Sequence, residues 1–87
     1  MKQEREVMGV KVAIDFEAMA DDYELLELNR RVMQNSVYVV DLLHYLLTDA
    51  EYEAAKDACR IDGRVSTTKL SEFALALFDS VSAVKNS

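Results

Sequence analysis

The stretch from Ala50 to Val81, AEYEAAKDACRIDGRVSTTKLSEFALALFDSV, predicts two helices joined by a sharp turn. Gly63 is expected to end the first helix, because glycine readily adopts a left-handed conformation. Ser66 is expected to cap the second helix. Apolar residues then recur at helical spacing: Leu70, Phe73, Ala74, Leu77, Phe78, Val81 and Val84. This pattern, in a chain without proline, indicates an all-α fold class.

The first of these helices has a clear start. Thr48 and Glu51 have the spacing of a capping box, in which each side chain accepts a hydrogen bond from the other residue's backbone N–H. Tyr52, Ala55 and Cys59 mark its expected buried face.

Two further helices are expected upstream. Residues 22–33 form the first, with Asp21 as its cap. Residues 37–47, VYVVDLLHYLL, form the second, with Ser36 as its cap. The second is apolar almost all round, so we expect it to be buried on several sides at the centre of the domain.

The N-terminal residues form only a weak strand pattern. Val10, Val12 and Ile14 alternate with more polar residues, but no second convincing strand is visible to pair with them. We therefore expect a partly flexible arm over residues 1–20 and a helical domain over residues 21–87. The predicted fold is a small bundle of about four helices with a short extended N-terminal arm.

Composition restricts the classes of partner. A chain of 87 residues with 51% hydrophobic residues has little interior, so we expect apolar surface shared with another chain and a homo-oligomer. The net charge of −6 argues against nucleic acid and anionic membranes as ligands. The single cysteine excludes an internal disulfide, and no apolar run reaches the roughly 18 residues of a membrane span. A cytoplasmic location is expected.

Acidic residues cluster between residues 15 and 27, where no base occurs. The six are Asp15, Glu17, Asp21, Asp22, Glu24 and Glu27. They form either a solvated helix face or an electrostatic guide for a basic protein partner. The second interpretation describes a small acidic regulatory or adaptor protein.

No catalytic, cofactor-binding or metal-binding residue is predicted. His44 has Asp41 three residues away, but no nucleophile accompanies them in a recognisable motif. One histidine and Cys59 cannot supply the four ligands of a structural zinc site. A calcium loop centred on Gly63 fails, because its ligand positions hold Ala58, Arg60 and Lys69.

Four residues are candidates for binding a partner: Tyr23, Leu26, Met33 and Tyr38. Tyrosine combines an apolar body with a polar tip, and methionine suits adaptable contact surfaces.

Several of these segments together resemble small tail assembly chaperones of long-tailed (siphovirus-type) bacteriophages. The likeness covers about residues 21–80. It rests on DYELLE at 22–27, YLL at 45–47, AEYEAAK at 50–56, DGRVS at 62–66 and LSEF at 70–73. The resemblance implies a non-catalytic protein without cofactors that binds the tape measure and tail tube proteins in the infected cell.

Overall fold

A computed structural model describes the backbone of residues 1–86 and the side chains of residues 1–78. The protein is mostly helical (63%), with two short antiparallel hairpins. The elements in chain order are β1 (Gln3–Val7), β2 (Val10–Ile14), α1 (Phe16–Met19), α2 (Tyr23–Gln34), the 3₁₀ turn η1 (Ser36–Tyr38), α3 (Val39–Leu46), α4 (Asp49–Ala58), β3 (Arg60–Ile61), β4 (Arg64–Val65) and α5 (Thr67–Asn86).

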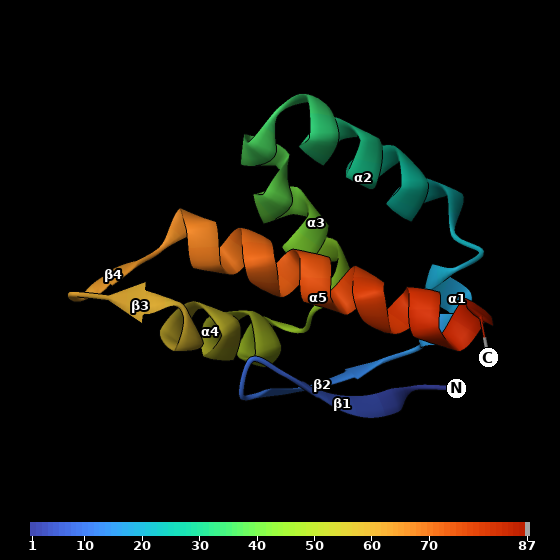
Figure 1. Ribbon diagram of the computed structural model, residues 1–87, viewed down its shortest axis with the longest axis horizontal. Coiled ribbons are helices and arrows are strands. Elements are labelled where there is room, and N and C mark those ends of the chain that lie inside the picture. The colour runs from blue at the N-terminus through green and yellow to red at the C-terminus, as the bar shows by residue number, and fades with distance from the viewer. Residues whose placement is uncertain (87) are drawn as a thin grey trace.

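The long helix α5 lies in the middle of the molecule (Figure 1). α2 and α3 lie on one side of α5, and α4 and the β1–β2 hairpin lie on the other. The buried face of α5 consists of Leu70, Phe73, Ala74 and Leu77, as the helical spacing predicts. Val81 and Val84, which belong to the same predicted stripe, lie outside the described side chains.

The N-terminal segment folds onto the rest of the protein. The prediction of an extended arm without a strand partner is wrong, because Gln3–Val7 pairs with Val10–Ile14. Val7 is the only fully buried residue of β1, so this edge strand lacks an apolar alternation. Segment 1–20 supplies six buried core residues: Val7, Val10, Val12, Ile14, Phe16 and Met19.

Helix α2 begins one residue later than predicted. Asp22, not Asp21, is its cap and accepts a hydrogen bond from the Leu25 N–H at 3.2 Å. After α2, Asn35 caps the 3₁₀ turn η1, so Ser36 does not have the expected capping role.

Helix α3 is shorter and less buried than predicted. Val39, Leu42 and Leu43 face the core, but Val40, His44 and Tyr45 are exposed. The prediction of burial on several sides is therefore wrong. An apolar residue on this helix is not always a core residue, because the molecule has too few elements to surround it.

The capping box that begins α4 is confirmed. The Thr48 side chain accepts from the Glu51 N–H at 3.2 Å, and one Glu51 carboxylate oxygen accepts from the Thr48 N–H at 2.9 Å. The other Glu51 oxygen accepts from the Ala13 N–H at 2.7 Å. Glu51 thereby links strand β2 to the start of α4 through hydrogen bonds.

Gly63 does not end α4, so that prediction is wrong. α4 ends at Ala58, and Asp62 and Gly63 form the turn of the β3–β4 hairpin, with φ of 53° and 83°. Ser66 has its predicted role, since its hydroxyl oxygen accepts from the Lys69 N–H at 3.2 Å at the start of α5.

Candidate protein-binding surface

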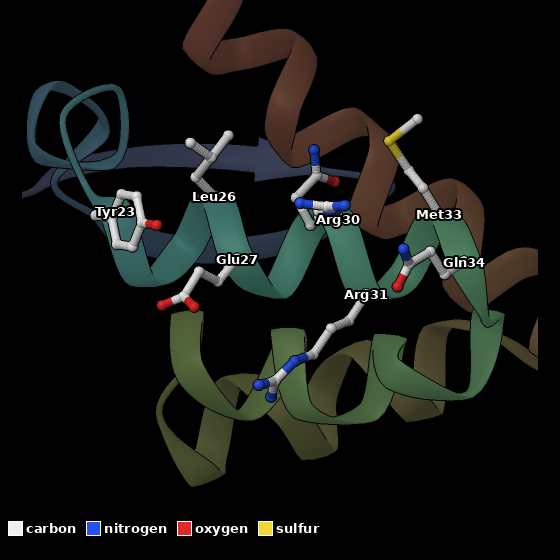
Figure 2. Close-up of a pocket in the computed structure, with 8 residues that line it drawn as sticks. Tyr23, Leu26, Glu27, Arg30, Arg31, Met33 and Gln34 are labelled. Carbon is white, nitrogen blue, oxygen red and sulfur yellow. The ribbon is translucent and has the colours of Figure 1, made fainter.

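Three of the four predicted contact residues lie together on the outer side of α2. Tyr23, Leu26 and Met33 are 73%, 62% and 82% exposed, and all three line one open hollow of about 560 Å³. Figure 2 shows Leu26 and Met33 projecting from the same side of the helix, with Arg30 between them. The outer side of α2 therefore exposes three apolar side chains to solvent, among charged and amide side chains.

Tyr38 does not join this group. It lies in η1, where the Arg31 guanidinium stands 5.9 Å from the centre of its ring. Arg31 projects from a different side of α2 than Leu26 and Met33 (Figure 2).

Two neighbouring hollows lie between α2 and α5, and we call them together the α2–α5 groove. The smaller hollow, which also borders α3, has a volume of about 190 Å³, and the larger one, at the wide end near α1, has a volume of about 370 Å³. Asn29 and Phe78 line both parts. The other apolar residues that line it are Met19, Ala20, Tyr23, Leu25, Leu26, Val32, Val39, Leu42, Ala74 and Leu75.

The sequence interpretation missed the α5 wall of this groove. Leu75 is 65% exposed and Phe78 is half-buried, yet only Phe78 falls on the predicted apolar stripe. The sequence did contain one indication of this wall, because Leu75 is a large apolar residue that lies off the predicted buried stripe. Such a residue on an amphipathic helix indicates either a contact or chance exposure, and the groove beside it favours a contact.

Charges are unevenly distributed around α2. Asp21 and Asp22 line the wide end of the groove, whereas Arg30 and Arg31 line the hollow on the outer side of α2. The Tyr45 hydroxyl donates a hydrogen bond to Asp22 at 2.6 Å. This bond lowers the pKa of Asp22 and raises the pKa of Tyr45 to about 12.

The potentially reactive side chains lie away from this groove. His44 is exposed and its ring lies 4.1 Å from the ring of Tyr52, and no hydrogen bond joins it to Asp41 in the described part of the chain. Cys59 is fully buried, and burial raises the pKa of its thiol, which disfavours the reactive thiolate. Among the described residues, no group of three or more His, Cys, Asp or Glu side chains is placed to hold a metal ion.

Comparison with known proteins gives no further assignment. Nothing matches this chain among protein-family models, curated proteins or solved structures. None of the described helices is both long and apolar enough to cross a lipid bilayer.

Proposed function

We propose that this protein is a non-catalytic tail assembly chaperone that binds helical segments of tape measure and tail tube proteins in the cytoplasm of an infected bacterium. The observation that supports the proposal best is the α2–α5 groove, whose walls are two helices with exposed apolar side chains. The resemblance of residues 21–80 to such chaperones supplies the identity of the clients.

The binding mode follows from the shape and chemistry of the groove. A helix that presents apolar residues at positions i, i+3 or i+4, and i+7 can place them between two helices of its receptor. Leu26 on α2 and Leu75 on α5 are the exposed anchors from the two walls. The net charge of −6 would keep a chaperone–client complex soluble while the client's apolar face is covered.

The alternative function, an acidic adaptor for a basic protein, has less support. Two of the six clustered carboxylates have structural roles, because Asp15 caps α1 and Asp22 caps α2. The exposed apolar residues beside them would have no role in purely electrostatic binding.

Co-purification with a client tests the proposal. The full chain is co-expressed with a tape measure protein encoded in the same genome, and we expect a stable complex. Leu75→Asp should abolish the complex, because it places a charge in the apolar groove. Ile61→Asp is the matched control, since Ile61 is also exposed but lies in β3 outside the groove.

Salt separates the two functions. An apolar groove should retain its client at high salt, whereas an acidic adaptor should release a basic partner as salt screens the charges. A chain that binds neither tape measure nor tail tube protein, or whose gene lies far from tail genes, would contradict the chaperone proposal.

A further inference from the structure

The outer side of α2 carries a regular stripe. Tyr23, Leu26, Arg30 and Met33 follow one another at intervals of three, four and three residues. This is the spacing of the contact seam between two paired helices. The stripe lies opposite the inner face of α2, where Leu25 is buried and Leu28 and Val32 pack against the core.

The stripe is complementary to itself when one copy runs antiparallel to the other. Residues 23 and 33 lie at equal distances from residue 28, and so do residues 26 and 30. A two-fold axis at residue 28 therefore places Tyr23 against the partner's Met33 and Leu26 against the partner's Arg30. Tyrosine beside methionine makes a favourable sulfur–aromatic contact, and the arginine stem packs against leucine.

The flanking charges match the same arrangement. The two-fold axis places the partner's Arg30 opposite position 26, one residue along the helix from Glu27. The same pair recurs on the other side of the axis, with the two copies exchanged. Two opposite-charge pairs result, whereas a parallel arrangement would place like charges beside each other. Among the described residues, Glu27 and Arg30 form no hydrogen bond or ion pair within their own chain, so both are free to make these pairs.

We infer that a second copy of this chain binds along the outer side of α2, giving an antiparallel two-fold dimer held by Glu27–Arg30 pairs. A helix of 12 residues gives a small interface, so the dimer should be weak, with a Kd of about 10 to 100 μM. The inference goes beyond the proposed function. Leu26 lines both the outer hollow of α2 and the wide end of the α2–α5 groove, so a second copy and a client would compete for it. The dimer test contains no client, so a negative result for the dimer does not contradict client binding, and a negative result for the client does not contradict the dimer.

Sedimentation equilibrium of the full chain from about 1 μM to about 1 mM tests the dimer. We expect a monomer–dimer equilibrium in which Arg30→Glu or Glu27→Arg weakens dimerisation by about tenfold or more, since each creates two like-charge pairs. Mixing these two variants should restore a heterodimer. The double variant Glu27→Arg/Arg30→Glu should restore the homodimer to within about threefold.

The control variants make the same charge changes at positions of α2 that do not belong to the Glu27–Arg30 pairs. Glu24→Arg and Arg31→Glu lie on the same exposed helix and should leave the dimer unchanged. Circular dichroism should show every variant folded, because the substituted side chains are exposed. A monomer over the whole concentration range would overturn the inference, as would a dimer or larger assembly that ignores the Glu27 and Arg30 reversals.

Discussion

Both glycines of the chain occupy the second position of a two-residue hairpin turn. Gly9 and Gly63 have φ of 82° and 83°, and the residues before them, Met8 and Asp62, also have positive φ. Such turns need two left-handed residues in succession. Aspartate tolerates this conformation, but methionine does so only at a cost in free energy.

Replacing Met8 should therefore stabilise the protein. Met8→Asn creates the favoured Asn-Gly turn, and we expect the free energy of unfolding to rise by about 0.5 to 1 kcal/mol. Urea denaturation measures the change. Asp62→Asn is the control and should be nearly neutral; a loss of stability in Met8→Asn would contradict the turn assignment.

The Tyr45–Asp22 bond should be visible in titrations. Tyr45 ionises near pH 12, because the carboxylate of Asp22 accepts its proton in a hydrogen bond and disfavours a second negative charge. Asp22→Asn removes that charge but keeps an acceptor for the cap. The pKa of Tyr45 should then fall towards its ordinary value, as measured by tyrosinate absorbance with Tyr45→Phe as the reference. An unchanged titration would exclude the bond.

The same pair makes stability depend on pH at the acidic end. The pKa of Asp22 is lower in the folded protein than in the unfolded chain. Its contribution is therefore present above the unfolded pKa and is lost as pH falls through the folded one. Tyr45→Phe should reduce the stability that is lost at low pH, as measured by thermal melts at successive pH values. An equal loss in the wild-type protein and the variant would argue against a link between the Tyr45 hydrogen bond and the pKa of Asp22.

At the scale of the elements, Glu51 connects the helical and β parts of the fold. Its two carboxylate oxygens accept from Thr48 in the capping box and from Ala13 on the outer edge of β2. The capping box was predictable, because it depends on residues three apart. The contact with Ala13 was not, since it joins residues 38 positions apart.

Glu51→Ala should destabilise the protein by about 2 to 4 kcal/mol, because it removes the capping interaction and leaves the Ala13 N–H without its partner. Glu51→Gln should cost less, since the amide oxygen can still accept one of the two bonds. Asp49→Ala, at an exposed position in the same turn, should cost under about 1 kcal/mol. Chemical denaturation compares the three, and equal effects of Glu51→Ala and Asp49→Ala would contradict the bridging role.

The β1–β2 hairpin shows where local patterns fail. Strand β1 has one fully buried residue, Val7, because its other residues lie on an exposed edge and are largely polar. Charged residues on an edge strand discourage pairing with other chains, but they also remove the alternation by which strands are recognised. The pairing partner of the clear β2 pattern was therefore invisible from the sequence.

For the molecule as a whole, the N-terminal segment is part of the core. Phe16 is fully buried beneath the guanidinium of Arg5, which stands 5.6 Å from the ring centre. Phe16→Ala should lower the free energy of unfolding by about 3 to 5 kcal/mol, whereas Glu17→Ala should have little effect. A negligible effect of Phe16→Ala on the free energy of unfolding, measured by urea denaturation, would indicate that residues 1–20 form a flexible arm and not part of the core.

Only the α2 part of the candidate surface could be predicted from the sequence. Tyr23, Leu26 and Met33 were found from their residue types alone, and the structure places them together. The α5 wall required knowledge of where α2 lies relative to α5, because Leu75 is recognisable as a contact residue only from the groove beside it. A binding surface shared between two elements depends on tertiary packing, which helical periodicity does not specify.

Backbone amide chemical shifts would show whether a client helix binds in the α2–α5 groove, as we propose. They are measured on the full chain while a helical segment of the tape measure protein is added. We expect saturable shift changes concentrated in α2 and around Leu75 and Phe78 of α5, which persist at high salt and leave the β1–β2 hairpin unaffected. Changes confined to the hairpin, changes that vanish at high salt, or no changes at all would rule out client binding in this groove.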